Sequence, residues 1–327
     1  MHKRDVLPLV VFYKQLSNHL NNAKKKSQKF NHVQKTTQGD TVLMGGNKDI
    51  FFKYAGSDLA CERRRADVGA PGIKFQSESI GEYRWERLAV TNTEGAESIG
   101  RPIGNYNTLN IPGLTLLDDA DIADAANEIS KELCASLDRL GVIPERLLVV
   151  GLGNRELTPD SVGPRVAERV TATMHVKNFD RRFFSELDCS EIAVCTPGVT
   201  SKTGMEAAEI VMAICERLEP DAVIAIDSLA SRSTERLGKT IQISDTGIFP
   251  GSGIGNGRRP LNESTLGSPV IAIGVPTVIN AKILIGDCRE SDEGTEELFV
   301  SPKDIDAITN ISSRIIAEGI NQAFGIF

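Results

Sequence analysis

The strongest constraint on the fold is a regular alternation of short apolar runs with helical patterns from residue 118 onward. Continuously apolar runs that predict buried strands lie at 147–152, 192–195, 222–227, 241–245 and 270–275. Helical spacing of apolar residues lies at 122–140, around 164–174, at 203–218 and at 305–315. Strands that are apolar on both faces and alternate with helices predict an α/β fold, in which helices sandwich a mostly parallel or mixed sheet.

Charge is distributed unevenly along the 327 residues. The first 58 residues hold ten basic and four acidic side chains, whereas the other 269 hold twenty-seven and forty. An acidic body argues against a nucleic-acid groove, because phosphates need a basic surface. No apolar run reaches the roughly 18 residues that span a bilayer, so we expect no membrane segment. Six cysteines without a CxxC pair indicate reduced thiols in a cytoplasmic protein.

Histidines are nearly absent from the acidic body. His2, His19 and His32 lie in the basic leader, and His175 is the remaining one. A zinc site built on two or three histidines is therefore excluded from the body. A serine or cysteine nucleophile paired with histidine would have to use His175.

Three of the expected strands have carboxylates at or after their ends: Asp160 comes after the strand at 147–152, and Asp227 and Asp245 each end a strand. Parallel sheets place their sites beyond the carboxyl ends of the strands. Two carboxylates brought close cannot both ionise easily, so such a pair can act as base and acid around a water molecule. Each residue alone also fits a structural role, because Asp160 can cap a helix and the other two can stabilise turns.

Two glycine-rich segments flank these carboxylates. Gly151, Gly153 and Asn154 form a turn after the first strand, but Glu156 replaces the third glycine of a dinucleotide fingerprint, so that signal is weak. The loop at 247–257, which includes Gly251 and Gly253, offers backbone N–H groups to an anion or an extended peptide. A solvated loop is the alternative.

At these residues the sequence resembles the germination protease family of endospore-forming bacteria. The stretches that carry the resemblance are Val150–Asn154, Thr158–Asp160, Thr196–Val199, Thr203–Gly204, Pro220–Asp227, Ala230–Ser233, Ile241–Gly247, Pro250–Asn256 and Pro269–Thr277. They follow the family order through about 150–280. Weaker similarity covers 57–112, and Val300–Asp304 with Asn321 matches the C-terminal helix.

The resemblance implies an endopeptidase that degrades small acid-soluble spore proteins during germination. It implies Asp160 and Asp227 as the catalytic pair, with Asp245 and the glycines Gly151, Gly153, Gly251 and Gly253, together with Asn154, positioning the substrate backbone. It further implies a homotetramer in the spore core, without a required cofactor, and a fold like that of hydrogenase-maturation endopeptidases, which is phosphorylase/hydrolase-like.

The resemblance also implies an inactive precursor that cleaves itself. The family's cleavage site, an acidic residue before an apolar-Ala pair, falls between Asp58 and Leu59. Residues 1–58 would then be a prosegment and 59–327 a single α/β protease domain. The substrates are cut after Glu before a similar pair, so this junction mimics a substrate.

Three departures from the family pattern stand out. The leader is longer than the usual prosegment, and the segment between Ile285 and Leu298 is much shorter than in better-known members. Phe249 replaces a histidine that is common before Pro-Gly-Ser-Gly.

Three other functions compete with the carboxylate protease. A metal-dependent peptidase would use the same carboxylates as ligands, and their hard oxygens suit Mg²⁺, Ca²⁺ or Mn²⁺. A peptidyl-tRNA hydrolase-like enzyme has a similar Gly-Leu-Gly-Asn turn, but it needs a nearby histidine and a basic face. A non-enzymatic nucleotide-binding or scaffolding protein would use the aspartates only as caps.

Overall fold

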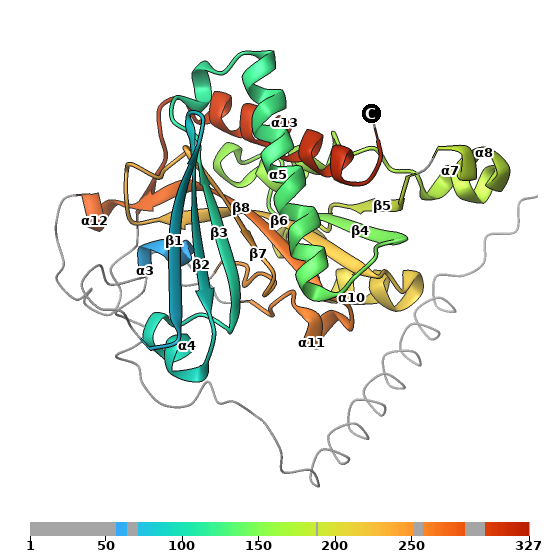
Figure 1. The fold of residues 1–327 in the computed structure, drawn as a ribbon, viewed down its shortest axis with the longest axis horizontal. Helices are drawn as coiled ribbons and strands as arrows, with labels where there is room; N and C mark the ends of the chain where they lie inside the picture. The colour runs from blue at the N-terminus through green and yellow to red at the C-terminus, as the bar shows by residue number, and fades with distance from the viewer. Residues whose placement is uncertain (1–56, 64–70, 188, 252–257, 285–297, 327) are drawn as a thin grey trace, which may run out of the picture. The chain divides into compact units, whose positions relative to one another are not determined.

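A mixed β-sheet forms the centre of the computed structural model, which describes residues 57–63, 71–187, 189–251, 258–284 and 298–326. Within these ranges the strand order is β1-β2-β3-β7-β8-β6-β4-β5, and β9 pairs with β8 (Figure 1). The strands are β1 (Ile73–Ile80), β2 (Tyr83–Val90), β3 (Gly104–Asn110), β4 (Arg146–Gly151), β5 (Glu191–Cys195), β6 (Ala222–Ser231), β7 (Thr240–Ser244), β8 (Val270–Asn280) and β9 (Phe299–Val300). All described residues belong to one compact unit.

Helices connect and cover these strands. They are α3 (Ala60–Arg63), α4 (Thr93–Ile99), α5 (Asp119–Leu140), α6 (Val162–Ala167), α7 (Met174–Phe179), α8 (Arg181–Glu186), α9 (Thr200–Thr203), α10 (Ala207–Leu218), α11 (Glu263–Leu266), α12 (Ala281–Leu284) and α13 (Ile305–Ala323). Two short 3-10 turns, η1 (Leu114–Leu116) and η2 (Thr158–Asp160), complete the described elements. None of the helices in the described residues is both long and apolar enough to cross a membrane.

Strand direction divides the sheet into two parts. Strands β5, β4, β6 and β8 run parallel to one another. Strand β7 runs antiparallel to β8 and to β3, and β1, β2 and β3 form antiparallel pairs. The predicted α/β fold with a mostly parallel or mixed sheet is therefore confirmed, and the sheet is mixed.

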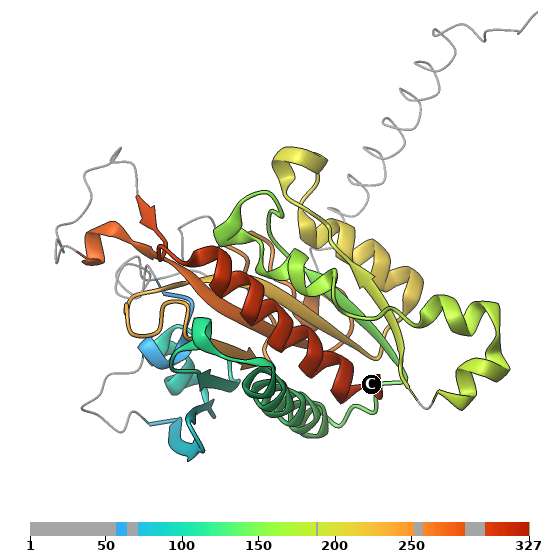
Figure 2. The ribbon, with the colours of Figure 1, turned by 90° about the horizontal axis from the view of Figure 1, so that it is seen from above.

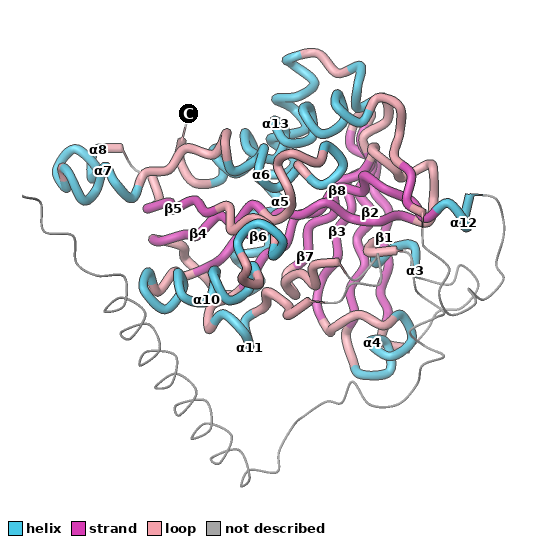
Figure 3. Tube along the Cα trace, turned by 180° about the vertical axis from the view of Figure 1, so that it is seen from behind, coloured by secondary structure: helices cyan, strands magenta, loops and turns pink. Residues whose placement is uncertain are grey.

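Helices lie on both faces of the sheet (Figure 3). On one face α5 and α13 lie side by side, as the view from above shows (Figure 2), and α6 packs beside α13. Their apolar side chains meet Ile224 and Ile226 of β6. On the other face, α10 packs against Val223 and Ala225 of the same strand. Strand β6 is thus buried on both sides, as its unbroken apolar run predicts.

Two predicted helices are shorter than expected. The pattern at 164–174 is interrupted because α6 ends at Ala167 and Thr173 joins β5 instead, where its backbone N–H donates to the carbonyl of Ile192 at 3.0 Å. The pattern at 203–218 divides at Gly204, which has φ +72°, so that α9 ends there and α10 begins at Ala207. In both cases a tertiary contact or a left-handed glycine overrides apolar periodicity.

One strand is longer than expected, and this changes the position of Asp227. Strand β6 continues to Ser231, since residues 228–231 pair with β8 through an irregularity between Leu229 and Ala230. Asp227 consequently lies inside the strand, and the prediction that it ends the strand is wrong.

A buried polar network joins α5 to β2 and β3. The indole N–H of Trp85 donates to Glu128 at 3.1 Å, and Asn107 donates to Glu132 at 2.6 Å. Arg87 and Arg139 also donate to Glu132. Burial of Glu132 opposes ionisation, but the hydrogen bonds from both arginines hold the pKa of this carboxyl below its usual range.

We expect Glu132→Gln to lower the free energy of unfolding at neutral pH by about 1.5–3 kcal/mol, the range for hydrogen bonds to charged groups. Because the folded pKa of Glu132 is depressed, its contribution is present above the unfolded pKa of about 4.3 and is lost as pH falls through the folded pKa. Urea unfolding at several pH values measures this difference. Glu78→Gln on the exposed part of β1 is the control and should change little. A pH-independent loss would contradict the interpretation.

Candidate active site

Three backbone segments meet where β4 passes into α6. The N–H of Leu152 donates to the carbonyl of Ile226 at 2.8 Å. A Cβ on Gly151 would lie 2.3 Å from the carbonyl oxygen of Gly163, and one on Gly163 would lie 2.5 Å from that of Ile226. Real Cβ atoms do not approach so closely, so only glycine allows α6 to begin directly against β4 and β6.

The turn that follows Gly151 holds Asp160. Gly153 has φ +109°, and a Cβ there would lie 2.2 Å from the backbone oxygen of Asp160. The backbone N–H of Asn154 donates to Asp160 Oδ2 at 2.8 Å. Gly153 and Asn154 therefore hold the Asp160 turn and its carboxylate in place, and the predicted role of Gly151, Gly153 and Asn154 in positioning the substrate backbone stays a prediction.

Asp227 lies beside this turn and is almost completely buried, with 7 % of its surface exposed. Its Oδ1 accepts from the N–H of Ser228 at 2.8 Å. Burial raises the pKa of Asp227 well above its usual range, and the negative charges of Asp160 and Asp58 raise it further. Burial also raises the pKa of Asp160, against the opposing effects of the Asn154 N–H and Arg258. The structure thus brings Asp160 and Asp227, here called the carboxylate pair, within electrostatic reach of each other.

Arg258 directly follows the predicted glycine-rich loop at 247–257. Its positive charge acts on both members of the carboxylate pair and opposes the rise of their pKa values. A cation here stabilises the negative charge that the pair carries after losing a proton. The only available signal in the sequence was the position of Arg258 at the end of the glycine-rich loop.

Asp245 lies apart from the carboxylate pair. Because β7 runs antiparallel to β8, the end of β7 points away from the edge at which the parallel strands finish. The Asp245 carboxylate accepts from the N–H of Asn105 at 2.7 Å and from its side chain at 2.6 Å, and Arg139 Nε lies 3.9 Å away. It therefore fixes the start of β3, and a role in positioning substrate stays a prediction.

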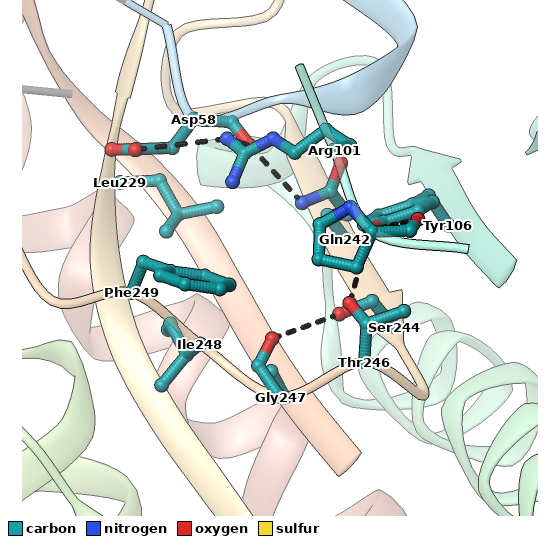
Figure 4. A pocket seen from close by; sticks show the side chains of 13 residues that line it. Asp58, Arg101, Tyr106, Leu229, Gln242, Ser244, Thr246, Gly247, Ile248 and Phe249 are labelled. Carbon is teal, nitrogen blue, oxygen red and sulfur yellow. Dashed lines mark hydrogen bonds and ion pairs between the residues drawn. The ribbon is translucent and has the colours of Figure 1, made fainter. Parts of the chain in front are cut away.

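The beginning of the predicted glycine-rich loop lines a cavity of about 30 Å³, which strands β3, β6, β7 and β8 and the segment after α4 also line (Figure 4). Gly247, Ile248 and Phe249 form one wall, and Asp58 and Arg101 lie opposite. A volume near 30 Å³ accommodates a group about the size of one water molecule. Gly251, with φ +73°, ends this part of the loop. Gly253 lies outside the described residues.

Residues 57–63, here called the junction segment, lie against β6. The N–H of Asp58 donates to the carbonyl of Ala230 at 2.8 Å, and Asp58 Oδ2 accepts from the N–H of Ala230 at 2.9 Å. Leu59 and Ala60 are fully buried. Leu59 belongs to the apolar cluster under α10, whereas Ala60 packs in a cluster with Leu88 and Tyr106. The predicted cleavage position between Asp58 and Leu59 is therefore held inside the body, at the strand that carries Asp227.

Other nucleophiles are poorly placed for chemistry at this position. Burial raises the pKa of the Cys61 thiol to about 11, so it stays protonated and weakly nucleophilic. His175, the one histidine among the described residues, lies on α7 beyond the edge strand β5 (Figure 1). Within the described ranges, no group of three or more His, Cys, Asp or Glu side chains is arranged to hold a metal ion.

A mixed sheet covered by helices, with a buried carboxylate close to a partly buried one and a peptide segment bound beside them, defines a hydrolase-like site. Residues 56–290 match the model of the germination protease family. A germination protease of Clostridium perfringens is 38% identical over 312 residues, which cover 82% of this chain and 94% of that protein. One of Caldanaerobacter subterraneus subsp. tengcongensis is 35% identical over 304 residues, which cover 82% and 93%.

The chain therefore belongs to the germination protease family, and it is a peptidase. Among solved structures, a NiFe hydrogenase maturation protease from Thermococcus kodakarensis KOD1 aligns with a TM-score of 0.34 and 19% sequence identity. That alignment covers 58% of this chain and 99% of the other.

We expect Gly153→Ala to impair peptide-bond cleavage, because the added methyl group would displace the backbone of Asp160. Stability should fall by about 1–3 kcal/mol from backbone strain. Gly141→Ala is the matched control, since Gly141 also has positive φ but has open space around it. Thermal unfolding and cleavage assays on both variants measure the two effects. Equal activity losses in both variants would contradict a specific role of the Gly153 turn.

We expect Asp227→Asn to raise the thermal unfolding temperature at neutral pH. Because the folded pKa of Asp227 is raised, ionisation of this carboxyl destabilises the fold as pH rises from the unfolded pKa, about 3.9, through the folded pKa. Asparagine does not ionise, so the variant lacks this penalty. Each kcal/mol gained adds roughly 2–4 °C in domains of 150–250 residues. The gain should shrink as pH falls through about 3.9 and vanish below it, where the wild-type carboxyl is protonated in both states. Asp180→Asn, an exposed helix cap, is the control, and an identical pH dependence of both variants would contradict this reading.

Proposed function

We propose that this chain is the precursor of an endopeptidase that begins the degradation of small acid-soluble spore proteins during germination. It cleaves itself between Asp58 and Leu59, and it cleaves substrates after an acidic residue that precedes an apolar-Ala pair. Residues 1–58 form the prosegment, and the protease works in the spore core as a homotetramer. Membership of the germination protease family supports this proposal, and the location, substrate and assembly follow from the family resemblance.

One observation carries the proposal: the junction segment contacts β6 through Asp58, beside Asp227. The N–H of Asp58 donates to the carbonyl of Ala230, and the carboxylate of Asp58 accepts from the N–H of Ala230. The charge of Asp58 also acts on the pKa of Asp227, three residues earlier in β6. Binding of an extended peptide to a strand supplies affinity through the main chain, and pockets for its side chains supply specificity. Disordered substrates suit this mode, because they present main-chain groups without prior unfolding.

The carboxylate pair provides acid and base for hydrolysis. One member, kept protonated by burial and by its neighbour's charge, donates a proton to the Leu59 nitrogen as the peptide bond breaks. The other accepts a proton from the attacking water molecule. Because such a pair works with one proton between the two groups, the rate of self-cleavage depends on pH, in agreement with activation during spore acidification.

Exposed apolar side chains on α7 and α8 are compatible with assembly. Phe179 is 94 % exposed and Phe183 is 51 % exposed, on helices that extend beyond β5 (Figure 1). Large apolar side chains that gather on a projecting element mark interaction sites. They support, for this proposal, a contact between copies of the chain.

The proposal is tested by incubating the purified full-length chain at mildly acidic and neutral pH and sequencing any new N-terminus. We expect Leu59 as the new first residue. Asp160→Asn and Asp227→Asn should each slow this cleavage by about 10²–10⁴-fold, the contribution of a general acid or base. Asp180→Asn, at the cap that precedes α8, should cleave at the wild-type rate.

Two results would contradict the proposal. Normal cleavage by the Asp160→Asn and Asp227→Asn variants would remove the carboxylate pair from the mechanism. Loss of wild-type cleavage on chelation, with recovery after adding one divalent metal, would instead favour the metal-dependent peptidase.

A further inference from the structure

Two side chains from distant parts of the sequence hold the bond between Asp58 and Leu59. Arg101 Nη2 donates to the carbonyl oxygen of Asp58 at 2.6 Å, and Gln242 Nε2 donates to the same oxygen at 3.4 Å. Gln242 Oε1 accepts from the N–H of Ala60 at 2.8 Å. The side-chain amide of Gln242 therefore contacts the backbone on both sides of this bond. Figure 4 shows Gln242 and Arg101 beside Asp58.

The acidic side chain of Asp58 is held by a different set of contacts. Its Oδ2 accepts from the N–H of Ala230 at 2.9 Å, and its Oδ1 lies 3.8 Å from Arg101 Nη2. Both charged side chains are 11 % exposed. A guanidinium buried to this degree is costly unless a negative group accompanies it, so a neutral or basic side chain in place of Asp58 would bind poorly.

The fold fixes both side chains in these positions. Arg101 follows Gly100, whose left-handed conformation ends α4 and turns the chain toward the cavity. In the sheet, Gln242 and Asp227 both pair with Gly274, one from each side, so the three residues share one level. A Cβ on Gly274 would lie 2.4 Å from the Leu229 side chain, and its absence leaves room for the packing beneath the junction segment.

We infer that Arg101, Gln242 and the N–H of Ala230 form the subsite that selects an acidic residue before the cleaved bond and that binds its carbonyl oxygen. This inference rests on the proposed self-cleavage. These groups would bind the residue on the amino-terminal side of the cleaved bond, first in the precursor and then in substrates that replace the junction segment.

The same contacts fit the chemistry of hydrolysis. When the water oxygen bonds to the carbonyl carbon of Asp58, the carbonyl oxygen gains negative charge. The bond from that carbon to the Leu59 nitrogen then breaks, the nitrogen takes a proton, and Asp58 becomes a free carboxylic acid. Donors aimed at the oxygen stabilise the charged intermediate, and a cationic donor at 2.6 Å is especially effective.

The Nε–H of Arg101 is a second donor that is available to an acidic side chain longer than aspartate. Among the described residues, no acceptor lies within hydrogen-bond distance of its buried Nε. An arginine binds a carboxylate best through two parallel hydrogen bonds, and the 3.8 Å separation from Asp58 Oδ1 shows that aspartate does not complete this geometry. Glutamate is one methylene longer and reaches further toward the guanidinium, so the subsite accepts Glu as well as Asp.

A double-mutant cycle on the full-length chain tests the subsite. Self-cleavage rates are measured for wild type, Asp58→Asn, Arg101→Gln and the combined variant. Asp58→Asn keeps an oxygen for the Ala230 N–H and removes only the charge. We expect it to slow cleavage by about 10- to 100-fold in the presence of Arg101, the range for hydrogen bonds to charged groups. In the Arg101→Gln background the same change should have almost no effect.

Further variants separate recognition from folding. Asp58→Glu should cleave at least as fast as wild type, and Arg101→Lys should retain a preference for Asp over Asn at position 58. Arg236→Gln is the matched control, since Arg236 is also partly buried and pairs with Glu86 at 2.8 Å. It should keep the full Asp-over-Asn preference even if its unfolding temperature falls.

The outcomes distinguish this inference from the proposed function. If Asp58→Asn costs the same in both backgrounds while wild type cleaves normally, the subsite assignment is overturned and the proposed function stands. If the wild-type chain does not cleave at Asp58 under any condition, the proposed self-cleavage and the subsite are both overturned.

Discussion

The close approach of three backbone segments at Gly151, Gly163 and Ile226 is the constraint on which the site depends. Side chains at either glycine would hold α6 away from the sheet and move the Asp160 turn with it. Because the segments touch, Asp160 from the β4–α6 connection comes within electrostatic reach of Asp227 in the adjacent parallel strand β6. The electrostatics of the site follow from this packing, since the nearby charge of Asp160 adds to the effect of burial in raising the pKa of Asp227.

The site also concentrates charge where the fold is otherwise apolar. Three acidic groups, Asp58, Asp160 and Asp227, lie near the cluster under α10, and two arginines oppose them. Arg258 acts on the carboxylate pair and Arg101 acts on Asp58. Such an arrangement costs stability, because burial penalises every unpaired charge, and proteins accept this cost chiefly where chemistry requires it.

Local patterns in the sequence predicted the fold class and three candidate carboxylates, and the family resemblance selected Asp160 and Asp227 as the pair. Apolar runs that lead into Asp160 and Asp227 are visible without the structure. Asp245 follows an equally apolar run, yet it lies apart from the carboxylate pair. The reason is the antiparallel direction of β7, which depends on the tertiary arrangement of the strands and cannot be seen in the local sequence. The contacts of Arg101 and Gln242 with the junction segment could not be predicted from the sequence either. They form only when the fold brings the end of α4 and strand β7 next to that segment. The helix predicted at 164–174 was too long for a similar reason, because the pairing of Thr173 with β5 is not local.

The burial of Leu59 and Ala60 has a consequence for the step that follows self-cleavage. Cutting the chain after Asp58 would leave these side chains in their apolar clusters, with Glu62 still accepting hydrogen bonds from the N–H groups of Arg232 and Ser233. The new chain end would then behave as a tethered competitive inhibitor, present at an effective concentration on the order of mM. Becoming an active protease would therefore require two events, bond breakage and departure of the product end, and the slower of them would set the time at which degradation begins.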